Sequence, residues 1–518
     1  MEAQDFWYII GKPLLFTIYQ ASLSTILTLI LGLPTAYIFA NYTFPGKRFI
    51  QTLLTVPFIL PTIAVAVAFN SLLGANGWIN ILLMSWLNLA TPPIQIVNTL
   101  PAILLAHVFY NTTIVIRLVG IALQELDPHI EQAGRVLGAS PTRNFTQVIL
   151  PLIMPSILAS SILVFLFNFT SFGVILLLGS PTATTLEVEI YIQALHMLNL
   201  PMAGLLSIIQ LTFTFAMALI YRRMGGFMII PISTRVMGER LRNPKKCFEK
   251  IITSTVISFL CIFYLTPMMA LISRSFTRIE TKQSGSAQIS ESFTLLYYQE
   301  LFINRRDDLF YVPPIKAAVN SILIAAITTF ISIALGLSSV YGIKKNPKVG
   351  KLLDTLLLLP LGASAVTVGL GYTIVFYRFP IVTQSFPWLI PIAHSLIALP
   401  FVYRSLVPAV NSIPINLQHA ASVLGASPIQ VWFKIELPII RKAVITSGIF
   451  SFAISLGEFG AASFLTRPEY PTLPTAIFRY FSQPGAVNYG QALAMTTLLV
   501  LICAASIFLV EVVEKRPV

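Results

Sequence analysis

The sequence predicts an all-α polytopic membrane protein composed of two homologous halves. The first observation is composition: 56% of the 518 residues are hydrophobic and 10% are charged, whereas soluble domains carry about a quarter charged residues. The second is the length of uncharged runs such as Leu14–Ala40 and Leu152–Leu178. About 20 apolar residues cross a bilayer as a helix, whereas barrel strands alternate over about ten residues. The third is an internal repeat.

Eleven segments have the length and composition of membrane-spanning helices. They lie near residues 14–40, 52–73, 100–120, 152–178, 202–221, 251–271, 315–343, 352–377, 388–408, 443–465 and 489–510. The apolar piece Trp78–Ala90 is too short to span. We expect it to form an outer amphipathic or re-entrant segment instead.

Lys and Arg are concentrated in four segments between or after these spans. Residues 222–250 carry eight Lys and Arg against two Glu, and residues 342–351 carry four Lys and no acid. Two further basic pairs stand at residues 47–48 and 515–516. The positive-inside rule assigns all four segments to the cytoplasm, with the N-terminus outside and the C-terminus inside. The formal net charge of +13 therefore indicates topology, and we expect no nucleic-acid partner.

Self-comparison gives the strongest signal in the sequence. Glu131–Pro151 matches Gln418–Pro438 at an offset of 287 residues (418 minus 131), and Gly32 matches Gly336 at an offset of 304 (336 minus 32). We expect two transmembrane domains, at residues 13–222 and 314–510. The intervening residues 223–313 hold a basic cytoplasmic linker, an extra helix at 251–271 and an external loop.

The repeated loop predicts two short helices joined at a glycine. Gly138 is suited to a left-handed C-cap, and Ser140 is suited to cap the next helix, with Pro141 in its first position. Phe145, Val148 and Ile149 give the second helix an apolar side, and we expect Pro151 to end it. Gly425, Ser427, Pro428 and Trp432 take the corresponding places in the second half. An exposed apolar face predicts a docking surface for another protein; the alternative is a hairpin that merely joins two spans.

The pattern resembles the E-A-A loop of type I ABC importer permeases. The residues that carry the resemblance or flank it in the first loop are Glu131, Ala133, Leu137, Gly138, Ala139, Ser140, Pro141 and Phe145, with Leu150 and Pro151 closing the motif. Those of the second loop are Gln418, Ala420, Leu424, Gly425, Ala426, Ser427, Pro428 and Trp432, with Leu437 and Pro438 closing it. Gln418 replaces the acidic residue, so the two loops are not equivalent.

The resemblance implies a permease subunit in the cytoplasmic membrane of a prokaryote. In this family the loop forms a coupling helix that docks on a nucleotide-binding subunit, and an external binding protein delivers the solute. Two fused halves imply two ATPase copies per chain, and ATP and magnesium belong to that partner, because the sequence has no G-x-x-x-x-G-K-[ST] loop. Besides these two proteins we expect only membrane lipid as a partner.

Two segments narrow the resemblance to a subgroup of such permeases. Residues 104–111 and 181–191 are similar to fused permeases of thiamine and thiamine pyrophosphate importers. Fused permeases of ferric-iron importers share the layout, so both solutes remain open. Two other classes also remain: an ion-gradient-driven secondary transporter with internal repeats, and a membrane scaffold.

Several polar residues lie inside expected spans. Glu458, whose repeat partner is Ser171, is either a carboxylate lining the path of a cationic solute or one member of a structural pair. Asn168 and Ser455 are candidates for the same path. His107 and His394 are related by the repeat and read as hydrogen-bonded packing residues or as ligands. The list of candidate path residues is thus Asn168, Ser171, Ser455 and Glu458.

Catalytic chemistry is not expected in this chain. The three cysteines, Cys247, Cys261 and Cys503, form no metal or redox motif. Neither metal-ligand spacing nor a nucleophile–base pair is present in the sequence. We therefore expect no metal site, no cofactor and no enzyme active site.

Overall fold

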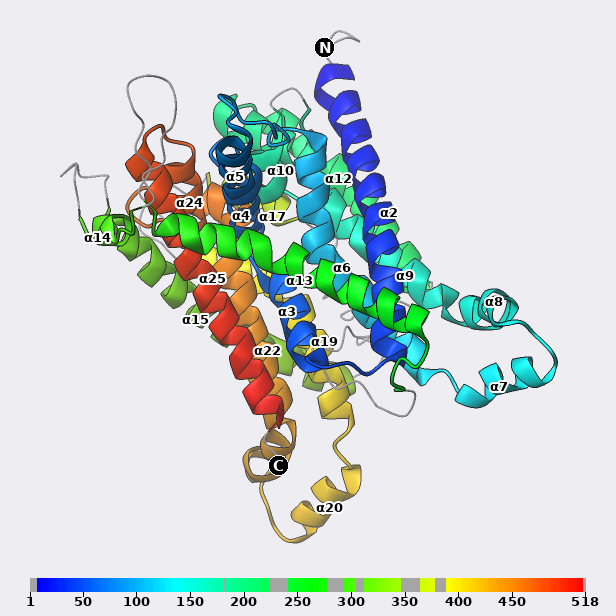
Figure 1. The fold of residues 1–518 in the computed structure, drawn as a ribbon. Coiled ribbons are helices and arrows are strands. Elements are labelled where there is room, and N and C mark those ends of the chain that lie inside the picture. Colours follow the sequence, from blue (N-terminus) through cyan, green and yellow to red (C-terminus); the bar gives the residue numbers. More distant parts are fainter. Residues whose placement is uncertain are drawn as a thin grey trace. The chain divides into compact units, whose positions relative to one another are not determined.

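The computed structural model describes residues 7–180, 183–223, 241–277, 292–303, 312–345, 364–377 and 388–515. The chain forms two compact units, Met1–Thr294 (unit 1) and Leu295–Val518 (unit 2), and Figure 1 shows the helices of each. Within the described ranges the regular structure is helical, apart from two isolated β-bridges. The predicted all-α class is confirmed.

Unit 1 contains long apolar helices and several short ones. Its elements are η1 (Trp7–Gly11), α2 (Lys12–Asn41), α3 (Lys47–Ile59), α4 (Thr62–Leu73), α5 (Trp78–Leu87), α6 (Leu100–Glu125), α7 (Pro128–Val136), α8 (Pro141–Asn144), η2 (Phe145–Ile149), α9 (Leu150–Phe169), α10 (Gly173–Leu178), α11 (Leu186–Tyr191), η3 (Ile192–His196), α12 (Leu200–Arg223) and α13 (Cys247–Ser275). Helices α2, α6 and α9 pack around a core that includes Val115, Leu118 and Ile153.

Unit 2 repeats the central part of this arrangement. Its elements are α14 (Leu296–Glu300), α15 (Pro314–Lys345), α17 (Ala365–Tyr377), α19 (Leu389–Asn411), α20 (Ile415–Val423), α21 (Pro428–Val431), η4 (Trp432–Glu436), α22 (Leu437–Gly457), α23 (Gly460–Leu465), α24 (Leu473–Phe481) and α25 (Ala486–Lys515). Helices α15, α19 and α22 pack around Val402, Leu406 and Ile440.

Within the described ranges, ten helical segments are long and apolar enough to cross a membrane. They overlap ten of the eleven expected spans. The eleventh, 352–377, lies partly outside the described residues, and its described part is the short apolar helix Ala365–Phe376. The apolar piece after α4 forms α5, a helix of 10 residues, which alone is shorter than a spanning helix. The candidate segment Thr62–Leu87 counted above joins α4 and α5 across the turn at residues 74–77.

Three expected spans are interrupted, which corrects the prediction of continuous helices at 52–73, 152–178 and 443–465. In the first, α3 ends at Ile59 and α4 begins at Thr62. Helix α9 ends at Phe169 and α10 begins at Gly173. Helix α22 ends at Gly457, where Glu458 takes an extended conformation (φ −72°, ψ 123°). The latter two breaks occur at polar residues: Ser171 and Asn168 bond to side chains of α6, and Glu458 bonds to N–H groups at the start of α23.

A second correction concerns Pro151, which does not end the helix after the docking loop. Residues Thr142–Phe169 run as one helical segment, with a π-helical turn before the proline. The N–H of Leu150 bonds to Phe145 O, and that of Leu437 bonds to Trp432 O, each five residues back. A π turn widens the helix locally, so the proline ring is accommodated where a regular α-helix would clash with it.

Close packing of the first and third long helices is repeated in both units. A Cβ at Gly32 would lie 2.7 Å from Val115 Cβ, and one at Gly336 would lie 2.9 Å from Val402 Cγ1. Real Cβ atoms do not approach neighbours so closely, and a well-packed interior yields only at a cost. The two glycines are related by the offset of 304 and the two valines by the offset of 287. The same glycine–valine contact is therefore present in both units.

Replacing these glycines by alanine is expected to destabilise the fold. Gly32→Ala and Gly336→Ala each add a methyl group to a filled contact, and overpacking costs about 1–3 kcal/mol. At Gly204 and Gly342, which lie in α12 and α15, a Cβ meets nothing within 4 Å, so alanine is expected to gain up to about 1 kcal/mol of helix propensity. Thermal unfolding in detergent measures the stability of all four variants. Equal shifts of the unfolding temperature would contradict close packing at Gly32 and Gly336.

Candidate functional site

The turn that ends the first helix of each docking loop has the geometry expected from the sequence. Gly138 and Gly425 have φ of +81° and +83°. The N–H of Gly138 bonds to Arg135 O and that of Ala139 to Gly134 O, each at 3.0 Å. The corresponding bonds in unit 2 run from Gly425 to Ser422 and from Ala426 to Ala421, also at 3.0 Å. Both are Schellman motifs, in which a left-handed glycine lets two N–H groups cap the last carbonyls.

The helix that follows each turn begins with a serine cap. Ser140 Oγ accepts from the N–H of Arg143 at 3.3 Å, and Ser427 Oγ accepts from the N–H of Gln430 at 3.3 Å. In unit 2 Gln430 Oε1 also accepts from the N–H of Ser427 at 2.9 Å, which completes a capping box. Two successive caps fix the angle between the helices, so each loop is a defined shape.

Two apolar residues at each turn are almost fully exposed. Val136 and Leu137 are each 87% exposed, and Val423 and Leu424 are 86% and 87% exposed. They stand at the ends of α7 and α20. Helix α7 lies at the end of unit 1 away from the N-terminus, and α20 lies at the end of unit 2 where α25 finishes (Figure 1). Exposed apolar pairs at matching places indicate a contact surface.

The remaining predicted loop residues lie around these pairs. Glu131 and Ala133 belong to α7, Ala139 and Ser140 connect it to α8, and Pro141 opens α8; the side chains of Glu131 and Pro141 are outside the described residues. In unit 2 Gln418 and Ala420 belong to α20, Ala426 and Ser427 connect it to α21, and Pro428 opens α21.

In unit 1 the second helix of the loop turns part of its apolar side inward, which corrects the expectation of an exposed face for that loop. Phe145 is 37% exposed and packs edge-on against Tyr37, with ring centroids 6.1 Å apart. Ile149 is buried in the core of unit 1. In unit 2, Ile429 and Phe433 on the second helix stay 70% and 59% exposed, so the exposed apolar surface there extends beyond the end of the first helix.

The replacement of the acidic residue by Gln418 has a structural counterpart. Gln418 Nε2 donates to Glu436 Oε1 at 2.6 Å, and Glu436 is buried. The repeat partner of Glu436 is Ile149, so unit 2 carries its carboxylate on the second helix, where unit 1 carries an apolar residue. A glutamate at position 418 would face that carboxylate, whereas an amide donates to it.

A buried polar cluster lies at the helix break of unit 1. His107 Nδ1 lies 3.0 Å from Ser24 Oγ, and Nε2 lies 3.0 Å from Ser171 Oγ. Beside it, Asn111 Nδ2 donates to Asn168 Oδ1 at 2.6 Å. All five side chains are buried, so the break between α9 and α10 is tied to α2 and α6 by hydrogen bonds.

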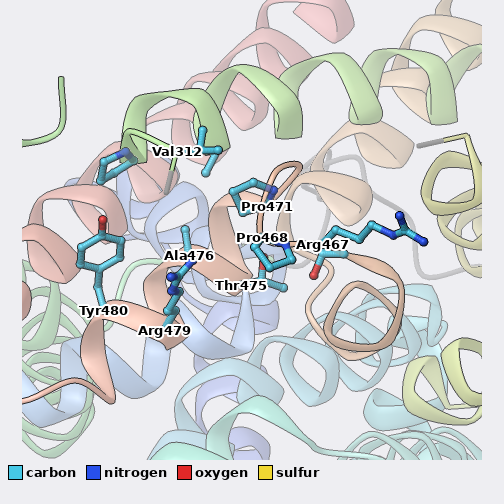
Figure 2. Close-up of a pocket in the computed structure, with 11 residues that line it drawn as sticks. Val312, Arg467, Pro468, Pro471, Thr475, Ala476, Arg479 and Tyr480 are labelled. Carbon is cyan, nitrogen blue, oxygen red and sulfur yellow. The ribbon is translucent and has the colours of Figure 1, made fainter. Parts of the chain in front are cut away.

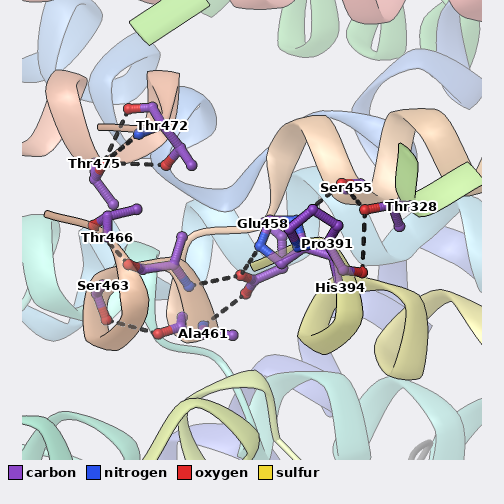
Figure 3. A network of polar contacts seen from close by, with 12 residues as sticks. Thr328, Pro391, His394, Ser455, Glu458, Ala461, Ser463, Thr466, Thr472 and Thr475 are labelled. Atoms are coloured by element: carbon purple, nitrogen blue, oxygen red, sulfur yellow. Dashed lines mark hydrogen bonds and ion pairs between the residues drawn. The ribbon is translucent and has the colours of Figure 1, made fainter. Parts of the chain in front are cut away.

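Unit 2 has the corresponding cluster, which Figure 3 shows. His394 Nδ1 lies 2.9 Å from Ser455 Oγ, and Ser455 Oγ donates to Thr328 Oγ1 at 3.2 Å. Thr328 is the repeat partner of Ser24 at the offset of 304. The sequence analysis did not single out Ser24 or Thr328, although that offset aligns them and both belong to the histidine clusters.

Glu458 takes the place of Ser171 in unit 2 and caps a helix. Its Oε1 accepts from the N–H of Ala461 at 3.1 Å, and its Oε2 accepts from the N–H of Ala462 at 3.0 Å. His394 Nε2 lies 3.2 Å from Oε2, off the line of a well-formed hydrogen bond (Figure 3). A carboxylate at a helix N-terminus satisfies otherwise unpaired N–H groups. Glu458 therefore stabilises the start of α23 where the chain leaves α22.

A pocket of about 270 Å³ lies at the connection between α23 and α24. Arg467, Pro468 and Pro471 come from the connection, and Arg479 and Tyr480 come from α24 (Figure 2). Both arginines are exposed. Helix α24 lies at the end of unit 2 away from α20 (Figure 1), and the guanidinium of Arg479 suits a carboxylate or phosphate.

Metal ligation has no candidate in the described part of the chain. No group of three His, Cys, Asp or Glu side chains there is arranged to hold an ion. The described sites are therefore docking turns, helix-capping polar clusters and a pocket that can contact an anion.

The fold and the paired loops define a membrane permease with two homologous halves. The chain belongs to the family described as binding-protein-dependent transport system inner membrane component, whose model matches residues 29–228 and 309–518. It is a multi-pass protein of the cytoplasmic membrane and the permease of an ABC importer.

Two relatives match this chain over nearly its whole length, and a third matches part of it. The chain is 25% identical to the thiamine transport system permease protein ThiP of Brucella abortus over 96% of this chain and 86% of the relative. Identity to ThiP of Escherichia coli is also 25%, over 99% of this chain and 89% of the relative. A putative 2-aminoethylphosphonate transport system permease protein of Salmonella typhi is 29% identical over 40% of this chain and 72% of the relative.

Proposed function

We propose that this permease imports thiamine or a thiamine phosphate ester, with two copies of a separate ATPase on its two docking loops and an external binding protein that delivers the solute. The doubled loop carries the ATPase part of the proposal. The relatives that carry the solute part are named for thiamine transport and match over at least 96% of this chain.

The exposed pairs Val136–Leu137 and Val423–Leu424 are the expected anchors for the ATPase. Interfaces draw most of their energy from a few side chains that enter pockets on the partner. A leucine that is 87% exposed on a rigid, doubly capped turn pays little ordering entropy on docking. Since each unit has one such turn, each binds one ATPase copy.

The external binding protein is expected to contact the end of unit 2 that lies away from its docking loop. By the charge asymmetry of the loops this end faces outward. Arg479 at the pocket there offers two parallel donors to an acidic side chain, which Arg recognises by bidentate hydrogen bonds.

Charging both turns is expected to remove the ATPase. In Leu137→Asp/Leu424→Asp each anchor becomes an ion that loses water on docking, and hot-spot losses of 2 kcal/mol or more per site reduce the bound ATPase by about 30-fold or more. Pull-down of the ATPase from the detergent-solubilised complex measures it. The matched control is Leu198→Asp, because Leu198 is 78% exposed in the connection before α12. An unchanged yield in the double variant would refute docking at these turns.

The solute is tested in proteoliposomes that contain the permease and its ATPase. The binding protein is added with thiamine, thiamine pyrophosphate, ferric ion or no solute, and ATP hydrolysis is measured. We expect thiamine and thiamine pyrophosphate to stimulate ATP hydrolysis and ferric ion not to do so. Stimulation by ferric ion alone would overturn the solute proposal and leave the ATPase docking intact. Uptake without ATP would favour a secondary transporter.

A further inference from the structure

Unit 1 contains an apolar pocket of about 690 Å³. It lies where α2 ends, where α9 and α13 begin, and beside the second half of α6. Its lining includes Leu33, Tyr37, Val119, Ile153, Ile157 and Ile252. Hydrophobic side chains make up most of the wall, and the helices belong to the candidate membrane spans.

The rim of the pocket opens beside α13. Phe248, on the first turn of α13, lines the pocket and is 72% exposed. Apolar cavities favour apolar occupants over water, and a pocket reached from the edge of a spanning helix is open to the acyl chains of the bilayer. The size and lining suit a hydrocarbon chain.

A basic segment is fixed at the rim by the end of α2. The N–H of Arg242 bonds to Asn41 O at 3.0 Å, and Arg242 O accepts from the N–H of Thr43 at 3.0 Å. The guanidinium lies 5.2 Å from the Tyr42 ring centroid and 3.1 Å from Glu249 Oε1. Tyr42 and Glu249 both line the pocket. Arg242 is thus held at the mouth with its side chain still 53% exposed.

Further cations surround the same mouth. Lys245 and Lys246 are exposed on the segment that follows Arg242, and Arg143 follows Thr142, another lining residue. Glu249 is the acid that lines the pocket, so the described mouth has a net positive charge. Lys47 does not belong to this set, because its Nζ donates to Phe39 O and Tyr42 O and burial lowers its pKa to about 8.

We propose that this pocket binds one anionic membrane phospholipid, with an acyl chain between α2, α9 and α13 and the phosphate beside Arg242, Lys245 and Lys246. Basic pockets between spanning helices favour anionic headgroups, and Arg matches a phosphate in shape. The apolar wall of the pocket accommodates the acyl chain of the lipid, and the cations at the mouth favour an anionic headgroup. The occupant would contact Phe145 and Leu150, so it also supports the helix that follows the docking loop of unit 1.

The first test measures lipid retention by native mass spectrometry of the full-length permease in mild detergent. Phosphatidylglycerol and phosphatidylcholine with the same acyl chains are the probes. One tightly retained phosphatidylglycerol is expected. Ile157→Trp, which fills the pocket, is expected to remove it, whereas Val444→Trp at the repeat-related position keeps it, because α13 has no repeat partner. Equal retention by both variants, or equal binding of both lipids, would overturn the proposal.

A second variant keeps the test decisive if Ile157→Trp fails to fold. Lys245→Gln/Lys246→Gln changes two exposed side chains and leaves the pocket wall intact. Each cation near a headgroup contributes about fivefold to binding, so phosphatidylglycerol retention is expected to fall about 25-fold, with little change for phosphatidylcholine. Undiminished retention of phosphatidylglycerol in this variant would refute the headgroup site.

Discussion

Valine at both Gly138 and Gly425 is expected to abolish assembly with the ATPase while leaving the membrane helices folded. Both glycines have positive φ, and a β-branched residue in that region costs about 1–3 kcal/mol. The strain opens the Schellman turns and moves Leu137 and Leu424 away from their fixed positions. Pull-down of the ATPase and thermal unfolding of the permease, measured together, separate loss of docking from loss of folding.

The control for this variant is Gly46→Val. Gly46 has φ of +76°, and a Cβ there meets nothing within 4 Å, so the substitution introduces similar strain outside the docking loops. It is expected to keep the ATPase. If Gly138→Val/Gly425→Val retains the ATPase as well as Gly46→Val does, the turns are not the docking element.

Removal of the Glu458 side chain is expected to have the largest effect on stability. Glu458→Ala leaves the N–H groups of Ala461 and Ala462 without their acceptor and takes the partner from His394. Each buried N–H group left without an acceptor costs about 1–3 kcal/mol. We expect a large drop in the unfolding temperature in detergent, and faster hydrogen exchange at the start of α23.

Two comparisons show whether this effect is structural. Glu458→Ser restores the residue type that unit 1 carries at Ser171, whose Oγ lies 3.0 Å from His107 Nε2. A serine at 458 is therefore expected to give His394 Nε2 a partner and to recover part of the loss. Ser171→Ala removes a neutral hydrogen bond and is expected to cost about 1 kcal/mol. If Glu458→Ala is as stable as the parent but impairs transport, the carboxylate lines the solute path instead.

Local sequence was sufficient for the docking loops. A left-handed turn followed by a capped helix is predicted by Gly138, Ser140 and Pro141. Turn formation and helix capping depend on a residue and its near neighbours, so the local sequence is sufficient to predict them. The repeat then assigned the same structure to Gly425 and Ser427. Exposure of Val136 and Val423 was not predicted, since it depends on where the second helix points.

The helix breaks were missed because hydropathy does not register them. Residues 152–178 contain no ionised side chain, and Ser171 is neutral, so the run reads as one span. The break is stabilised by His107, which is distant in sequence. The prediction that Pro151 ends a helix is wrong because it rests on the clash of a proline ring with the preceding turn of a regular α-helix. The π turn before Pro151 relieves that clash.

By itself the sequence determined the membrane class, the twofold repeat and the form of each docking loop, because composition, period and capping are encoded in neighbouring residues. Only the tertiary structure decided which polar side chains meet. It paired His394 with Glu458 and His107 with Ser171, and it joined Gln418 to Glu436. Buried polar groups must find partners across helices, and those partners are chosen by packing between segments that are far apart in the chain.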